Sequence, residues 1–407
     1  MSTDNAAPAE APVDPAGRDP RDFGDELLAT EQRPVARGRG GRRRAVVPAS
    51  DGEILVAGHA EVVRVAEDAE TFSSAVSAHL QIPNGLDGRE HIRFRRLLDR
   101  YLAPDVVAEY GEPFRHVARA VVDDFLTGRT ARVDAVDDLG ATFAVRAMRA
   151  WLGWPAELEE RLLAWIAENS AATRSRDRSR TAAVAEEFDD IIAEVVRPRL
   201  EAPDRFDDVT AELVHDTSLG RKLEFAEIVS ILRNWTAGDL GSVARCIGVV
   251  LHGLTENLAL QEHLRFGVSD AEFTAVVDEL LRVDNPFVSN RRVTTCPVTL
   301  SGVELPEGQR VRIHWTAANR DPEAFRDVEA FDPEGNAGKN LVWGTGPHVC
   351  PGKPLSILEI RAFIEELLKA ATVWPAEGTG DDGAGGASRG VHPVGGWEHY
   401  PVELERL

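Results

Sequence analysis

Apolar residues recur at helical spacing along most of the chain. One face is shared by Val106, Tyr110, Phe114, Val117, Val121 and Phe125, which is the period of an amphipathic helix. Similar patterns predict helices around Met148 and over residues 156–169, 183–196, about 224–255 and about 270–283. Residues 170–182 are polar and are predicted to form a loop that could serve as a lid.

The period changes to alternation in residues 291–321. This pattern predicts short hairpin strands, with turns at Ser301 and Gly302 and at residues 306–308. A strand is predicted at residues 53–58, with a short helix after it, and a final strand pair is predicted after the loop at 376–390. The sequence therefore predicts a mainly α protein with small β-sheets.

Composition bears on disorder and on the cellular location of the protein. Residues 1–20 are rich in Ala, Pro and Asp without periodicity and are predicted to be a disordered tail. The chain has no apolar run of membrane-spanning length and no hydrophobic N-terminal stretch, so neither a membrane span nor a signal peptide is expected. Three widely spaced cysteines fit a reducing, cytoplasmic location.

Charge bears on the choice of partner. The formal net charge of -22 argues against nucleic-acid binding. The basic stretch "RGRGGRRR" at residues 37–44 is a local exception that an RNA-binding patch would explain. A solvated loop before a strand is the preferred interpretation.

The strongest chemical signal is "LVWGTGPHVCPGKPLSILEIR" at residues 341–361. Gly344, Gly346 and Gly352 let the backbone turn tightly or approach a flat partner closely. Apolar positions from Leu355 onward predict a helix, so Cys350 lies at a loop-to-helix junction. The N–H groups and the helix dipole at such a junction favour a thiolate. Cys350 is therefore expected to be a ligand or a nucleophile.

Three chemistries compete for this thiol. Zinc would need about four clustered ligands, and no second Cys/His pair lies near Cys350 and His348 in the sequence. A catalytic thiol would need a histidine base and an oxyanion hole, which the sequence does not exclude. A haem iron would take the thiolate as its axial ligand. It would also need cations for its two propionates and a helix across its far face.

Candidates for the propionate cations exist. His91 and Arg95 lie four residues apart in a helical pattern, so they could clamp a carboxylate together. Arg93, Arg96 and Arg100 favour the alternative of a solvated basic face. Arg292 begins a predicted strand and is a further candidate. Glu279 and Arg282 are spaced to form a helical pair, which alone carries little meaning.

Together these residues resemble the cytochromes P450. "WGTGPHVCPG" resembles the haem-binding loop of that family, with Trp343 where phenylalanine is usual. "ELLR" resembles its Glu-x-x-Arg element, "AANRDPEAF" and "FDP" resemble the stretch between the two, and "HIRFR" resembles its His-x-x-x-Arg helix. The order and spacing agree from about Phe72 to the C-terminus.

The resemblance implies a cytochrome P450 fold, with one α-rich domain over residues 21–407 and haem b between the long central helix and the cysteine-loop helix. Cys350 would be the thiolate ligand of the iron, with Gly344 and Gly352 shaping its loop. His91, Arg95, Arg292 and His348 would contact the propionates. Glu279 and Arg282 would be structural.

One stretch departs from the family pattern. The long helix usually carries Ala-Gly-x-acid-Thr, whose acid and alcohol manage protons for dioxygen cleavage. Here "NWTAGDLGSVARCIG" places Leu240 and Gly241 at those positions, or Ser242 at the alcohol position in a register slipped by one. Asp239 and Ser242 could form a displaced pair, a water held at Gly241 or a substrate hydroxyl could deliver the proton, or Asp239 could be structural.

The resemblance implies a monooxygenase that activates dioxygen and oxidises a small organic molecule. Electrons would come from NAD(P)H through a ferredoxin reductase and a ferredoxin. Residues 77–85, 234–242, 286–291 and the turn at Gly396 and Trp397 would form the substrate pocket. The alternatives are a peroxide-driven peroxygenase and, from a different class, a haem-binding sensor or carrier without turnover.

Overall fold

The computed structural model describes residues 45–175, 177–378, 386–390 and 392–407. The predicted tail at residues 1–20 and the arginine-rich stretch at 37–44 lie outside these residues. Helices dominate the described part of the chain. The longer ones are α2 (His59–Glu67), α3 (Gly88–Tyr101), α5 (Gly111–Phe125), α6 (Thr142–Leu152), α7 (Glu159–Ser175), α8 (Arg178–Glu201), α10 (Phe225–Glu256), α11 (Leu258–Arg265), α12 (Asp270–Val283) and α15 (Lys353–Ala370).

Short helical segments connect these elements. They are α4 (Pro104–Val107), α9 (Val209–His215), α13 (Trp315–Ala318), α14 (Pro333–Asn336) and a π-helical segment, η2 (Ala135–Ala141). Side-chain caps fix several starts. Ser269 accepts a hydrogen bond from the Glu272 N–H at the start of α12, and Glu224 and Glu227 form a capping box at the start of α10.

The strands of the described residues form four small sheets. The largest has the order β1-β2-β8-β5-β3, with β1 (Val46–Pro48), β2 (Ile54–Val56), β3 (Phe72–Ser73), β5 (Ser289–Thr294) and β8 (Arg310–His314). A three-stranded sheet has the order β4-β12-β9, with β4 (Thr130–Asp134), β9 (Ala371–Pro375) and β12 (Pro401–Arg406). The two hairpin sheets pair β6 (Val298–Leu300) with β7 (Val303–Leu305) and β10 (Ser388–Arg389) with β11 (Trp397–His399).

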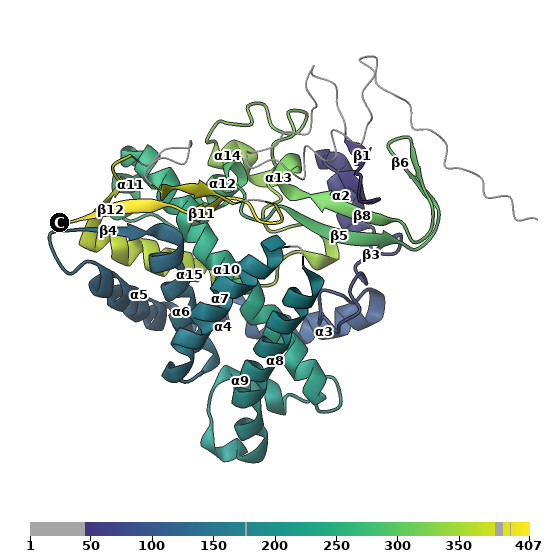
Figure 1. Cartoon of the computed structure of the whole chain (residues 1–407), viewed down its shortest axis with the longest axis horizontal. Coiled ribbons are helices and arrows are strands. Elements are labelled where there is room, and N and C mark those ends of the chain that lie inside the picture. The colour runs from purple at the N-terminus through teal and green to yellow at the C-terminus, as the bar shows by residue number, and fades with distance from the viewer. Residues whose placement is uncertain (1–44, 176, 379–385, 391) are drawn as a thin grey trace, which may run out of the picture.

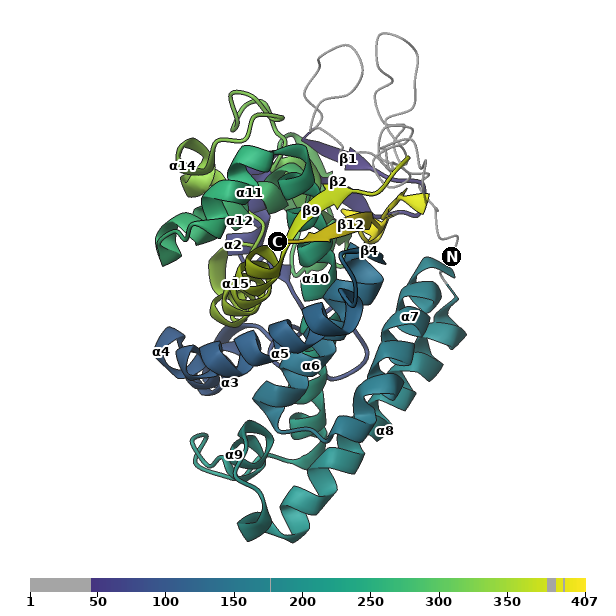
Figure 2. The same ribbon diagram turned by 90° about the vertical axis from the view of Figure 1, so that its left-hand side faces the viewer.

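Helix α10 runs through the middle of the helical part, with α7 and α8 on one side of it (Figures 1 and 2). The five-stranded sheet and α3 lie away from α5, α6 and the three-stranded sheet (Figure 1). A Cβ atom on Gly140 of η2 would lie 2.7 Å from the Ala244 carbonyl oxygen of α10. The absence of a side chain there therefore lets η2 pack directly on α10.

Most predicted elements are confirmed, and one is wrong. The helix at 270–283 coincides with α12, and the turn at Ser301 and Gly302 joins β6 to β7. The predicted polar loop at 170–182 is largely helical instead, because α7 continues to Ser175 and α8 begins at Arg178. Glu168 and Arg180 join these two helices through an ion pair of 2.7 Å, and Asp177 caps α8. Polar residues there coat exposed helix surfaces.

Among the described residues no single helix is both long and apolar enough to span a membrane. Helices α10 and α11 meet that test only as a pair, and a bend of 112° separates them.

Candidate active site

A cavity of about 350 Å³ lies between α10 and the cysteine loop. Cys350, His348 and Gly344 line it from the loop, and Gly238 and Ser242 line it from α10. Segments distant in the sequence complete its wall, including Gln81, Asn84, Phe287, Asn290 and Arg292. Residues from the predicted pocket segments 77–85, 234–242 and 286–291 therefore meet around Cys350. Gly396 and Trp397 do not line this cavity.

The cysteine loop is held by its backbone and by α12. The Cys350 N–H donates to the Trp343 carbonyl oxygen at 2.8 Å. Trp343 Nε1–H donates to Asp278 Oδ1 at 2.6 Å, and Lys353 Nζ donates to Asp278 Oδ2 at 2.7 Å. Gly346 has φ +71°, and a Cβ there would lie 2.7 Å from the Ala66 carbonyl oxygen of α2. Only glycine combines that conformation with that close approach.

The Cys350 sulfur lies just before the first turn of α15. Burial raises the pKa of this thiol, whereas hydrogen bonds from the Gly352 N–H and the Lys353 N–H to the sulfur, and the nearby Arg95, act in the opposite direction. A Cβ atom on Gly352 would lie 3.7 Å from the sulfur. The loop thus provides N–H donors that would stabilise a thiolate once a metal replaced the proton.

Three cationic or cation-capable side chains gather at the same cavity. The rings of His91 and His348 lie 4.2 Å apart between centroids, and Arg292 lines the cavity with His348. Burial, reinforced by His91 and Arg292, lowers the pKa of His348 to about 4. Burial also lowers the pKa of His91 and of Arg292. One carboxylate pairs with this cluster: Asp87 Oδ1 lies 3.3 Å from His348 Nε2. Three cation-capable side chains therefore share one negative charge.

These residues fit a haem. A flat dianionic group would supply the negative charge that His91, His348 and Arg292 lack, and its metal would take the Cys350 sulfur. The Nε2 atom of His91 is buried without a hydrogen-bond partner among the described residues, so it is available to a propionate. Arg95 is placed differently: its guanidinium pairs with Asp99 at 2.7 Å and donates to the Pro347 carbonyl oxygen at 3.0 Å.

Glu279 and Arg282 form a buried ion pair on α12. Two hydrogen bonds of 2.8 Å join the guanidinium and the carboxylate. Arg282 also donates to the carbonyl oxygens of Asn319 and Ala330, and Glu279 accepts from the Asp332 N–H. The pair therefore ties α12 to the irregular segment that leads into the cysteine loop.

The predicted residues of α10 separate onto different sides of the helix. Ser242 lines the main cavity, whereas Asp239 does not. Asp239 is buried against Ser356 and Glu359 of α15, and burial raises its pKa to about 7. No hydrogen bond joins Asp239 to Ser242 among the described residues. Gly241 lies beside Arg245, whose Nη1–H donates to the Gly241 carbonyl oxygen at 2.9 Å.

Sequence reasoning missed Glu359. This residue is fully buried, and burial together with the neighbouring Asp239 raises its pKa well above the ordinary value. The available signal was a carboxylate on the apolar face of α15, between Leu355 and Phe363. Two buried carboxyl groups in contact cannot both ionise cheaply, so they share at least one proton near neutral pH.

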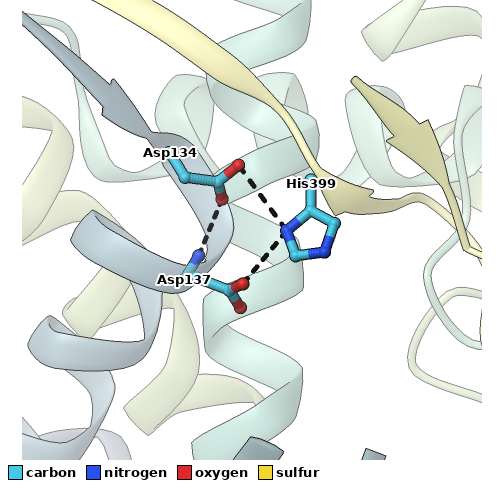
Figure 3. A group of neighbouring side chains, drawn as sticks. All are labelled: Asp134, Asp137 and His399. Carbon is cyan, nitrogen blue, oxygen red and sulfur yellow. Dashed lines mark hydrogen bonds and ion pairs between the residues drawn. The ribbon is translucent and has the colours of Figure 1, made fainter. Parts of the chain in front are cut away.

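A separate polar cluster lies outside the cavity. Asp134 ends β4, Asp137 lies in the first turn of η2, and His399 ends β11 (Figure 3). His399 Nδ1 lies 3.0 Å from Asp137 Oδ2 and 3.9 Å from Asp134 Oδ2. Asp134 Oδ1 already accepts hydrogen bonds from the N–H groups of Val136 and Asp137. The cluster therefore joins three elements at the turn between β11 and β12.

The chain is similar in sequence and fold to known proteins. Residues 273–382 match the family model described as Cytochrome P450. The erythromycin C-12 hydroxylase of Saccharopolyspora erythraea is 27% identical over 325 residues, covering 76% of this chain and 80% of that protein. The cyclomarin C epoxidase CymV of Salinispora arenicola is 26% identical over 324 residues, covering 75% of this chain and 80% of that protein.

A solved structure of a P450 EryK mutant in complex with erythromycin B aligns with a TM-score of 0.78 and 25% identity. The alignment covers 89% of this chain and 93% of that one. A helical fold around a thiol-lined cavity with a cationic cluster fits a haem-thiolate protein. The family-model match, the curated relatives and the solved structure together support a cytochrome P450 of the bacterial type. It is an oxidoreductase of the monooxygenase class, and the family implies a haem cofactor.

Proposed function

We propose that this protein uses haem b and dioxygen to oxidise a small organic substrate, by hydroxylation, demethylation or a similar reaction. Electrons come from NAD(P)H through a ferredoxin reductase and a ferredoxin. The observation that carries the proposal is the Cys350 thiol in the wall of the cavity that it shares with His348, Arg292 and the α10 residues Gly238 and Ser242. Hydroxylase and epoxidase relatives support the reaction class.

A haem iron held by a thiolate supplies dioxygen activation and O–O bond cleavage. The residues of the chain would bind the haem and orient the substrate. Cys350 would hold the iron, and His91, His348 and Arg292 would hold the propionates. Gly238 and Ser242 of α10 form the wall opposite the cysteine loop, and Asn84 and Asn290 offer polar contacts to the substrate.

Proton delivery differs from the usual acid and alcohol on the long helix. The side chain of Asp239 is turned towards α15, and the alternative alcohol, Ser242, lines the cavity without it. We infer that a water near Gly241 or Ser242, or a substrate hydroxyl, delivers protons in place of an Asp239–Ser242 pair. The same observation favours a second candidate function, a peroxide-driven peroxygenase, because peroxide brings its own protons.

The first experiment tests the thiolate. The reduced carbon-monoxide complex should show the strongly red-shifted Soret band of thiolate ligation, and Cys350→Ala should abolish that band. A histidine-type spectrum in the wild-type protein would refute the assignment.

Turnover then separates the two candidate functions. Product formation with a ferredoxin system favours the monooxygenase, and product formation with peroxide alone favours the peroxygenase. Normal coupling in an Asp239→Asn/Ser242→Ala variant supports proton delivery by water or substrate, whereas severe uncoupling supports the displaced pair.

A further inference from the structure

Arg245 lies on α10 one turn after Gly241, with its guanidinium folded back along the helix. Its Nη1–H donates to the Gly241 carbonyl oxygen at 2.9 Å, and its Nη2–H donates to Ser170 Oγ of α7 at 3.0 Å. Both acceptors are neutral. A guanidinium carries five N–H donors, so three remain for another partner.

The shortage of negative charge around Arg245 is unusual in this protein. Other buried arginines pair directly with carboxylates, as Arg199 does with Asp208 at 2.6 Å and Arg282 with Glu279 at 2.8 Å. Among the arginines that are buried or half-buried in the described residues, Arg245 and Arg292 lack a carboxylate within ion-pair distance. Arg292 lines the haem cavity, where a propionate would be its partner.

Charged groups on neighbouring elements do not replace a direct partner for Arg245. Burial lowers the pKa of Arg245, and Glu398 and Asp137 act to raise it from a distance. Glu398 forms its own ion pair with Arg174, and the positive charge of Arg174 lowers the pKa of Arg245. Asp137 pairs with His399 at 3.0 Å (Figure 3). A charge taken out of water without a countercharge is costly, so this guanidinium is suited to bind an anion.

A small cavity adjoins this guanidinium. It has a volume of about 60 Å³ and is lined by Arg245, Asn169, Ser170 and Gly241, among others. Ser242 lines both this cavity and the main cavity beside Cys350. A Cβ atom on Gly241 would lie 3.0 Å from Arg245 Nη1, so the glycine makes room for the guanidinium. The small cavity holds a compact polar group but not a whole substrate.

We propose that Arg245 binds the carboxylate of the substrate, and that the substrate is therefore a small organic acid whose apolar body extends into the main cavity. This proposal rests on the proposed function, because it places a monooxygenase substrate. Free N–H donors on Arg245 bind one end of the carboxylate, and the Asn169 amide is a second donor. Fixing the acid end at α10 and α7 sets which carbon of the apolar body would face the haem iron, on the side opposite Cys350.

The test compares acids with uncharged analogues of the same shape. Octanoate, dodecanoate and cinnamate, each beside its primary amide, are titrated into haem-loaded protein at low salt and pH 7. Binding is followed by equilibrium dialysis and by the spin-state change of the haem. We expect the acids to bind at least about tenfold more tightly than their amides, as a charge-assisted hydrogen bond gives.

Substitutions at Arg245 test whether this residue causes the preference for acids. Arg245→Gln should remove the preference for acids, and Arg245→Lys should retain part of it. Arg180→Gln, which removes an exposed guanidinium paired with Glu168, is the matched control and should retain all of it. Equal binding of acids and amides to the wild type, no binding of any acid, or a preference that survives Arg245→Gln would overturn the proposal.

The wild-type comparison remains decisive even if Arg245→Gln does not fold. The thiolate spectrum of each sample reports separately on the proposed function. A normal spectrum without acid preference therefore refutes only the carboxylate site, whereas loss of the thiolate spectrum in the wild type refutes the haem-thiolate assignment itself.

Discussion

At the residue scale, Asp278 shows how one carboxylate holds a loop from two directions. It accepts hydrogen bonds from Trp343 on one side of Cys350 and from Lys353 on the other. The Lys353 ammonium also lies 5.6 Å from the centre of the Trp343 ring. The tryptophan that replaces the family's usual phenylalanine therefore adds a polar anchor between the cysteine loop and α12.

Haem retention tests the cationic cluster. Arg292→Leu should raise the haem dissociation rate, because a charge-assisted hydrogen bond of about 1.5–3 kcal/mol is lost, while the thiolate spectrum stays unchanged. Arg95→Leu is the comparison and should have the smaller effect, since Arg95 already pairs with Asp99. The rates can be measured by transfer of haem to apomyoglobin. Equal effects of the two substitutions would contradict the placement of the propionates.

The carboxyl pair of Asp239 and Glu359 predicts a pH dependence of stability. Burial raises the pKa of Asp239 from 3.8 to about 7, so the folded state keeps a proton that the unfolded state releases. The free energy of unfolding should therefore fall as the pH rises from about 4 to about 7, by at most about 1.4 kcal/mol per pH unit for each group. Above pH 7 the contribution of Asp239 should be constant.

Asp239→Asn removes that dependence for one group. Relative to the wild type, the variant should gain stability steadily between pH 5 and pH 7 in urea unfolding monitored by the thiolate spectrum. An Asp239→Asn/Glu359→Gln variant should flatten the profile further. Parallel profiles for the wild type and the single variant would show that Asp239 is already ionised at pH 5.

At the scale of elements, α12 connects two parts of the site. Its Glu279–Arg282 pair binds the segment before the cysteine loop, and its Asp278 binds the loop itself. Arg282 is fully buried and lies 4.8 Å above the Phe325 ring. The position of α12 therefore fixes the position of the cysteine loop and of Cys350.

Breaking the buried pair should be costly. Arg282→Leu leaves Glu279 buried without its countercharge, and about 3–5 kcal/mol of stability should be lost. Arg93→Ala removes an exposed guanidinium that pairs with Glu90 at 2.9 Å and should cost at most about 1 kcal/mol. Urea unfolding of both variants gives the comparison. Similar losses would mean that the Glu279–Arg282 pair is not the element's main anchor.

Much of the element pattern was predictable because apolar periodicity reports burial directly. The helix at 270–283 was found at its observed boundaries, and the turn at Ser301 and Gly302 was found from its turn residues. The strands β4 and β9 were missed, because their pairing partner is β12, far away in the sequence. The contacts of Asp239 were missed for a related reason: only the crossing of α10 and α15 brings Glu359 to it.

At the scale of the whole molecule, the net charge of -22 would oppose docking of an acidic redox partner such as the proposed ferredoxin, and such docking would depend on a local patch. Arg93, Arg96 and Arg100 project from α3, and Lys353 and Arg361 lie on α15. Four of these five form ion pairs with carboxylates. Arg96 is exposed and has no such pair among the described residues.

Reduction by a ferredoxin should therefore be sensitive to salt and to Arg96. The rate of electron transfer should fall as ionic strength rises, because screening shortens the Debye length to roughly 8 Å at physiological salt. Arg96→Glu should lower the rate further at low salt, and the difference should shrink at high salt. Arg129→Glu, which changes an exposed arginine just before β4, is the control. A rate independent of salt would place docking on an apolar surface.

The close approach of Gly241 and Arg245 constrains how this protein can change. A threonine at position 241 would recreate the alcohol of related enzymes, but its Cβ would take the space of Arg245 Nη1. The effect of that substitution thus depends on which residue occupies position 245, which is epistasis in its simplest form. With arginine at position 245, the guanidinium must shift by a few tenths of an ångström to admit the new side chain. The cost of the usual alcohol is therefore set by how freely Arg245 can move.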